Sequence, residues 1–351
     1  MLKIAVDAMG GDQAPAAVVD GAVSAARHLA IQIALVGRTA DLEAALAPHP
    51  DWRQLGLEIV EAPEVIGMSD SPVAALRRRP RASIRVAADL VAAREAAALF
   101  SAGHTGATVM AAYGAFGMIP GVDRPALAAT IPTRDTPAVL LDSGATVECR
   151  PQHLLQFAVM GSAYARVALG VERPRVGILS IGEEETKGNE LTREAHRLLK
   201  ALALRSLGEG GPPLNFIGNV EGREIYSGAA DVIVCDGFTG NVVLKTSEGL
   251  VEVVETLLGA ELQGTFSSQM GYLLSRRAFR RFRKRVDYSE YGGAPLLGVA
   301  GLAIVGHGRS SPKAVRNAIA MAFRFASSDF LQRVERDIAA AGVMTDRVSR
   351  E

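Results

Sequence analysis

The chain has 351 residues, enough to build one large core or two lobes. Lys plus Arg and Asp plus Glu number 38 each, so no excess charge points to a nucleic-acid partner. The two cysteines, Cys149 and Cys235, are too few for a disulfide framework or a zinc site, which favours the reducing cytoplasm.

The chain begins with a short apolar run that ends at Asp7, which predicts a core strand and not a signal peptide. Similar β-branched runs then alternate with helical patterns. We expect strands at residues 4–6, 31–36, 57–60, 97–100, 128–131, 138–141, 176–181, 215–220, 232–235 and 301–305, and helices at residues 16–29, 83–95, 153–169 and 240–258. Ser311 and Pro312 open the last long helix, as N-cap and first position. This alternation predicts an α/β fold with a doubly wound, mostly parallel sheet and helices on both faces, resembling a Rossmann fold.

The longest uncharged stretch, residues 96–122, has enough length to cross a bilayer. It contains a Gly-His-Thr-Gly turn and Pro120, so a strand, a turn and a buried helix explain it better than a membrane span.

Residues 263–286 interrupt the alternation with a basic amphipathic pattern. At helical spacing Tyr272, Phe279, Phe282 and Val286 share one stripe. The rest is basic: Arg276, Arg277, Arg280, Arg281, Arg283, Lys284 and Arg285. Two interpretations stay open, a surface for anionic lipid or an acidic partner, and a solvated face over a packed or dimer-forming stripe. We expect residues 255–290 to protrude as a helical arm from a single catalytic unit of residues 1–351.

Two turns of the form Gly-x-Thr-Gly each follow an apolar strand and precede a helix. In a parallel sheet such turns lie at the ligand-binding edge, where helix N-termini favour anions. Residues 7–12 and 305–312 have similar chemistry, and a tight turn with a Ser or Thr cap is the alternative for each. The predicted anion site consists of Gly103, His104, Thr105, Gly106, Asp236, Gly237, Thr239 and Gly240.

The motifs of nucleotide binding and of serine hydrolases are missing from the sequence. Inorganic phosphate, or the phosphate of a carrier group, therefore fits the predicted anion site better than ATP or NAD. Glu183, Glu184 and Glu185 lack a His or Asp to complete a metal site, so we expect no metal and a solvated loop. Nearby Lys187 can neutralise a phosphate or an oxyanion, with a plain surface lysine as the alternative. Cys235 is expected to pack in the core.

Several blocks along residues 4 to about 325 carry a resemblance to one family. They read IAVDAMGGD, SAGHTGA, KGNEL, NFIGNVEGRE, CDGFTGNVVLKTSEG, EYGGAPLLGV and HGRSSPKAVRNAI. Together they resemble the bacterial phosphate acyltransferases of phospholipid synthesis, the PlsX family. The resemblance implies transfer of a fatty acyl group from acyl carrier protein to inorganic phosphate, without a cofactor or a covalent acyl-enzyme. It also implies the fold of phosphotransacetylases and isopropylmalate dehydrogenases.

The same resemblance implies a homodimer in the cytoplasm that associates with the anionic inner face of the plasma membrane. A membrane-bound glycerol-3-phosphate acyltransferase would take over the product, and no nucleic acid is involved. The expected contacts with membrane or carrier protein are Tyr272, Arg276, Arg277, Phe279, Arg280, Arg281 and Phe282. The alternative is a phosphotransacetylase-like enzyme that uses acyl-CoA.

Under this interpretation the two turns and Lys187 hold the phosphate, which attacks the thioester directly. The catalytic candidates are Lys187, Asn189, Asn241, Lys245 and His307. The family usually has Asn at the position of His104, so exchange of His104 for Asn should leave turnover intact.

Overall fold

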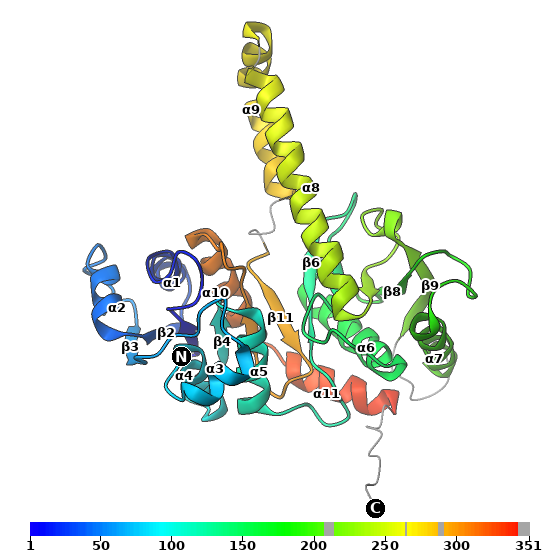
Figure 1. The fold of residues 1–351 in the computed structure, drawn as a ribbon, viewed down its shortest axis with the longest axis horizontal. Helices are drawn as coiled ribbons and strands as arrows, with labels where there is room; N and C mark the ends of the chain where they lie inside the picture. Colours follow the sequence, from blue (N-terminus) through cyan, green and yellow to red (C-terminus); the bar gives the residue numbers. More distant parts are fainter. Residues whose placement is uncertain (207–213, 264, 287–290, 343–351) are drawn as a thin grey trace, which may run out of the picture.

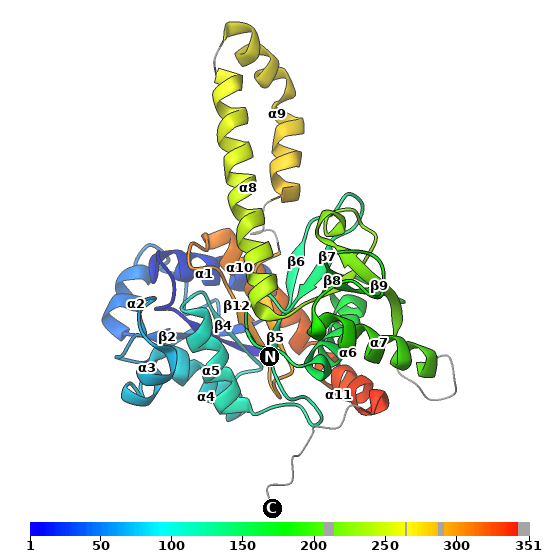
Figure 2. The same cartoon turned by 45° about the vertical axis from the view of Figure 1, so that its right-hand side comes forward.

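The computed structural model describes residues 1–206, 214–263, 265–286 and 291–342. Two sheets lie side by side, and α8 begins between them (Figures 1 and 2). The first sheet has the order β3-β2-β1-β4-β12-β11-β5. Its strands are β1 (Lys3–Asp7), β2 (Gln32–Gly37), β3 (Leu57–Glu61), β4 (Ala98–Ser101), β5 (Ala126–Leu127), β11 (Ala294–Leu297) and β12 (Ala303–Val305). All neighbours are parallel except β11, which runs antiparallel to β12 and β5.

Helices cover both faces of the first sheet, because successive side chains of a strand point to opposite sides. In β1, Ile4 and Val6 face one apolar cluster, together with α1 (Ala16–His28) and α10 (Pro312–Ala326). Ala5 faces the other, with α4 (Ser83–Ala92) and α5 (Thr105–Phe116). The shorter helices are α2 (Thr39–Leu46) and α3 (Pro72–Arg78).

The second sheet has the order β6-β7-β10-β8-β9. Its strands are β6 (Ala129–Ile131), β7 (Ala138–Leu141), β8 (Arg175–Ser180), β9 (Asn215–Glu221) and β10 (Val232–Val234), and only β6 is antiparallel. Helix α6 (Pro151–Ala168) packs on this sheet, with α7 (Glu190–Ser206) and α11 (Phe330–Ala341) beside it. A short 3-10 helix, η1 (Gly222–Glu224), follows β9.

Helices α8 (Gly237–Gln263) and α9 (Phe266–Val286) form an antiparallel hairpin that projects from the body (Figures 1 and 2). Thr265 caps α9, since its hydroxyl oxygen accepts the amide hydrogen of Ser268 (3.2 Å). On α9 the rings of Tyr272 and Phe279 lie 5.4 Å apart. The predicted apolar stripe therefore begins as expected, while the Val286 side chain lies outside the described residues.

The α/β fold with helices on both faces is confirmed, although the parallel strands divide into two sheets. The run expected at residues 128–131 corresponds to β6, which pairs with β7 of the second sheet, whereas β5, just before it, was not predicted and pairs with β11 of the first sheet. Strand β11 was not predicted, since Pro295 weakens its pattern. Ser311 caps α10 as expected, but α10 is not the last helix, because α11 follows it.

Candidate active site

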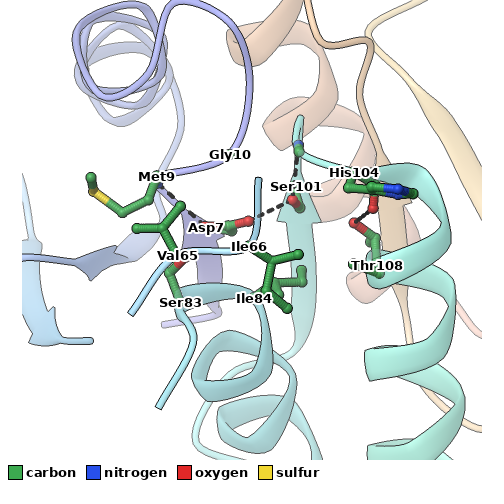
Figure 3. A pocket seen from close by; sticks show the side chains of 12 residues that line it. Asp7, Met9, Gly10, Val65, Ile66, Ser83, Ile84, Ser101, His104 and Thr108 are labelled. Carbon is green, nitrogen blue, oxygen red and sulfur yellow. Dashed lines mark hydrogen bonds between the residues drawn. The ribbon is translucent and has the colours of Figure 1, made fainter. Parts of the chain in front are cut away.

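The first Gly-x-Thr-Gly turn lies above a buried carboxyl group (Figure 3). Asp7 ends β1 beside Ser101, the last residue of β4. The Ser101 hydroxyl donates to the Asp7 carboxyl (2.7 Å) and accepts the amide hydrogen of Gly103 (3.1 Å). Burial raises the pKa of Asp7, against hydrogen bonds from Ser101, Ser83 and nearby amides. At Gly10 a Cβ would lie 2.7 Å from both Asp7 and the Gly103 nitrogen, so only glycine fits between them.

A small cavity lies beneath this turn, lined by Asp7, Ser83, Ser101, His104 and Thr108 among others (Figure 3). Its volume is about 10 Å³, which accommodates one water and no phosphate. An anion at this turn would therefore lie on its outer side.

The second turn repeats the arrangement in the other sheet. Asp142 follows β7 and pairs with Cys235, as Asp7 pairs with Ser101. In both sheets the first glycine of the turn comes two residues after that partner. Asp142 is buried and accepts the amide hydrogens of Leu127, Gly144, Ala145 and Thr146 at 2.6–3.0 Å. Burial raises its pKa in spite of these bonds.

Gly240 also has a steric role, since a Cβ there would lie 1.9 Å from the Asp142 carbonyl oxygen. The Cys235 thiol points to the same carbonyl oxygen (3.5 Å). Cys235 is only 3% exposed, which confirms it as a core residue, and this burial raises the pKa of its thiol well above the usual value.

In each turn, a side chain of the turn itself already accepts one of the backbone amide hydrogens that could bind an anion. His104 Nδ1 accepts the amide hydrogen of Gly106 (3.1 Å). Asp236 accepts the amide hydrogen of Thr239 (2.8 Å) and the Thr239 hydroxyl (2.7 Å). Asp236 thus places a carboxylate at the positive end of α8, where it competes with an external anion. That the turn amides hold phosphate stays a prediction.

Lys245 and His307 are 62 residues apart in the sequence and meet between the two sheets. Lys245 lies two turns into α8, which follows β10, and His307 follows β12. Lys245 Nζ is 3.0 Å from His307 Nε2 and 2.7 Å from the Glu248 carboxylate. His307 Nε2 lies 3.5 Å from the same carboxylate oxygen. Two predicted candidates are thus neighbours, and Glu248, which was not among the predicted site residues, joins them.

The other catalytic candidates take different places. Asn241 lies one helical turn before Lys245 on the same face of α8, beside Gly144. Asn189 caps α7, because its side-chain oxygen accepts the amide hydrogen of Thr192 (2.9 Å). Lys187 is exposed in the loop between β8 and α7. The structure thus places Lys187 and Asn189 in the loop before α7, whereas Lys245 lies on α8 in contact with His307.

Three large apolar side chains are exposed in segments that follow strands of the second sheet. Ile181, Phe238 and Val147 are 82%, 63% and 58% exposed. Ile181 directly follows β8, Phe238 lies in the first turn of α8 after β10, and Val147 lies in the loop between β7 and α6. The amide of Gly237 donates to the Thr146 carbonyl oxygen (2.9 Å), which joins the backbone of the last two segments. We call these three residues the apolar rim. Exposed apolar groups gathered at one place are typical of a binding surface.

In the part of the chain that the structure describes, no cluster of His, Cys, Asp and Glu is suited to a metal ion. A search of the same residues found no helix with the length and apolar character to cross a membrane. Cys149 is unsuited to act as a nucleophile, since burial raises the pKa of its thiol to about 12.

This chain is similar in sequence to one group of known proteins and in fold to another. A family model described as "Fatty acid synthesis protein" matches residues 2–333. A phosphate acyltransferase of Acidobacterium capsulatum is 51% identical over 340 residues, which cover 97% of this chain and 98% of that protein. A phosphate acyltransferase of Syntrophotalea carbinolica is 51% identical over 349 residues, covering 99% of this chain and 96% of the relative.

Solved structures agree on the fold. The EutD phosphotransacetylase of Staphylococcus aureus has a TM-score of 0.54 at 18% identity, covering 95% of this chain and 94% of that chain. A phosphotransacetylase of Streptococcus pyogenes has a TM-score of 0.56 at 18% identity, covering 93% and 94%. At this identity the likeness shows the fold alone. The sequence matches show more: the chain belongs to the phosphate acyltransferase (PlsX) family and is an acyltransferase of lipid synthesis.

Proposed function

We propose that this enzyme moves a fatty acyl group from the thioester of acyl carrier protein to inorganic phosphate. One observation carries the assignment of the site: Lys245 and His307 meet at the junction of the two sheets, at the carboxyl ends of their strands. In open α/β folds this edge is where ligands bind.

A phosphate oxygen attacks the thioester carbonyl carbon, and a carbon–oxygen bond forms while the carbonyl becomes an oxyanion. The carbon–sulfur bond then breaks, which gives acyl phosphate and a thiolate that takes a proton from solvent. The thiol has an ordinary pKa of about 8.5 and leaves without a strong acid. The chain therefore has to supply orientation, positive charge and hydrogen-bond donors. Lys245 provides the charge, His307 a ring N–H donor, and Asn241 lies one turn away from Lys245.

The apolar rim supports a long acyl chain as the transferred group. Val147, Ile181 and Phe238 are exposed in the segments that follow β7, β8 and β10, and Phe238 lies in the first turn of α8, the helix that carries Lys245. A fatty chain that covers them removes apolar surface from water, at about 25 cal/mol per Å².

An acyl-CoA-dependent enzyme is the alternative, and the fold shared with phosphotransacetylases favours it. The decisive assay incubates the protein with labelled phosphate and either palmitoyl carrier protein or palmitoyl-CoA, and traps acyl phosphate as hydroxamate. We expect product from the carrier protein at a much higher kcat/KM. Equal or better turnover of palmitoyl-CoA would contradict the proposed donor.

Substitution of Lys245 or of His307 tests the site. Lys245→Ala and His307→Ala should each lower kcat/KM by about 100-fold, the usual effect of losing one group that stabilises an oxyanion. Lys200→Ala is the matched control, because Lys200 pairs with Glu185 on the surface of α7. Wild-type rates in both site variants would show that the chemistry lies elsewhere.

We also propose that α8 packs on a second copy of this chain. Leu250, Val253, Val254 and Leu257 are exposed at helical spacing on one face of α8. A homodimer would cover this stripe, and light scattering should then give twice the chain mass of 36.9 kDa. A monomer at micromolar concentration would contradict it.

A further inference from the structure

Glu248 lies on α8 within reach of both Lys245 and His307. Its carboxylate accepts a hydrogen bond from Lys245 Nζ (2.7 Å) and lies 3.5 Å from His307 Nε2. Only 23% of its side chain is exposed. Glu252 and the charged residues after it on α8 lie farther than Glu248 from the start of the helix.

The hydrogen bond at His307 Nδ1 determines which ring nitrogen can donate to the Glu248 carboxylate. His307 Nδ1 accepts the amide hydrogen of Arg309 (3.2 Å), which leaves the proton of a neutral ring on Nε2. Nε2 faces Lys245 Nζ at 3.0 Å, so two donors lie next to each other. They stay together because the Glu248 carboxylate is an acceptor that both share.

The carboxylate also remains charged at neutral pH. Burial by itself would raise the pKa of Glu248, but the hydrogen bonds from His307 and Lys245 lower it overall. A charged acceptor forms stronger and shorter hydrogen bonds than a neutral one, so it fixes its partners more firmly.

We infer that Glu248 is a positioning residue, which holds the Lys245 ammonium group and the His307 imidazole side by side so that both act on the phosphate. It does so across the two halves of the molecule, since α8 follows a strand of one sheet and His307 a strand of the other. Glu248 itself does not touch the substrate, because a carboxylate repels phosphate. This inference rests on the proposed function.

Removal of the Glu248 charge should change the KM for phosphate in opposite directions under the two possible roles of this residue. If Glu248 were only a negative charge near the site, its removal would strengthen phosphate binding and lower KM. If it positions Lys245 and His307, its removal lets them move apart. We then expect Glu248→Gln to raise the KM for phosphate by about 10- to 100-fold, a range seen when a residue that orients binding groups is lost.

Glu252→Gln is the matched control, because Glu252 is exposed one helical turn farther on the same face of α8 and undergoes the same change of charge. Its KM should equal that of the wild type. Glu248→Asp keeps the charge but shortens the reach, and its KM should lie between those of the wild type and Glu248→Gln. Thermal unfolding of each variant separates loss of positioning from loss of fold.

The experiment measures kcat and KM for phosphate with palmitoyl carrier protein at saturation. A KM for Glu248→Gln that is unchanged or lower than that of the wild type would overturn the inference. Should Glu248→Gln not fold, a wild-type KM in Glu248→Asp would overturn it equally. If the wild type is active and Glu248→Gln has an unchanged KM, only the role of Glu248 is contradicted and the proposed function stands. If the wild type makes no acyl phosphate, the proposed function and the role of Glu248 are both contradicted.

Discussion

At the scale of single residues, His104 shows how a side chain can stabilise the start of the helix that follows it. Its Nδ1 caps α5 by accepting the amide hydrogen of Gly106. An Asn side chain also caps helices well, through its carbonyl oxygen. The PlsX family usually has Asn at position 104. His can replace it there because both side chains offer a hydrogen-bond acceptor at the N-cap.

This cap leads to a prediction for two variants. His104→Asn should keep kcat/KM within about twofold of the wild type and leave the free energy of unfolding nearly unchanged. His104→Ala should lose about 1 kcal/mol of that free energy, the usual effect of removing an N-cap acceptor. Chemical denaturation and the acyl phosphate assay measure the two quantities. A large loss of activity in His104→Asn would show that the imidazole has a role of its own.

Only some residues of the candidate site could be predicted from the sequence. Lys245 and His307 were candidates because they lie in two of the sequence blocks that resemble the PlsX family, CDGFTGNVVLKTSEG and HGRSSPKAVRNAI. Glu248 was missed, because a Glu in a helix is usually a solvated residue and its two partners come together only in the fold. Asp142 was missed for a similar reason, since three of its four amide donors lie in a loop without a motif and the fourth, Leu127, belongs to β5.

At the scale of elements, an ion pair joins the starts of β8 and β10. Buried Asp231 accepts hydrogen bonds from the Arg175 amide (2.8 Å), Nε (3.0 Å) and Nη2 (2.9 Å). Burial alone would raise the pKa of Asp231, but the bonds from Arg175 lower it below its ordinary value. A carboxyl group whose pKa is depressed by folding stabilises the protein above its unfolded-state pKa.

The pH dependence of Asp231→Asn follows from that sign. At pH 7 the variant should lose about 1–3 kcal/mol of the free energy of unfolding, as expected for hydrogen bonds to a charged group. The difference should shrink as the pH falls from about 4, the ordinary value, through the lower pKa of the folded state. Urea unfolding at several pH values measures it. Asp51→Asn is the control, because its pair with Arg27 is exposed and should matter less.

Strand pairing at the same scale was only partly predictable. The buried runs of β1, β2, β4, β8 and β10 are visible in the sequence because strands covered on both faces are apolar at consecutive positions. β5 and β6 form one continuous run in the sequence, and the structure divides them between two sheets. A local pattern specifies that a segment is extended but does not specify its neighbour.

At the scale of the whole molecule, the hairpin of α8 and α9 stands away from the two sheets (Figures 1 and 2). Exposed Arg276, Arg277, Arg280 and Arg281 lie on α9, close to exposed Leu273 and Leu274. Basic and apolar groups together are typical of helices that lie on anionic membranes. We propose that α9 binds such a membrane, with the acidic carrier protein as the alternative partner.

Charge reversal tests this proposal. Arg276→Glu with Arg280→Glu should lower the binding of the protein to vesicles of anionic phospholipid by at least tenfold, since each basic residue near the surface contributes about 1 kcal/mol. The double reversal Arg333→Glu and Arg336→Glu on exposed positions of α11 is the control. Unchanged vesicle binding together with weaker carrier-protein affinity would assign the arm to the protein partner instead.

The sequence by itself determined the α/β class, the two matching turns, the basic amphipathic helix and the resemblance to phosphate acyltransferases. Each of these is encoded locally, in the period of apolar residues, in glycine positions and in ordered motifs. Only the tertiary structure decided that there are two sheets, that Asp7 and Asp142 are buried beneath the turns, and that Lys245, Glu248 and His307 form one cluster. Contacts between residues far apart in the chain depend on how the elements pack, and no single stretch of sequence specifies that packing.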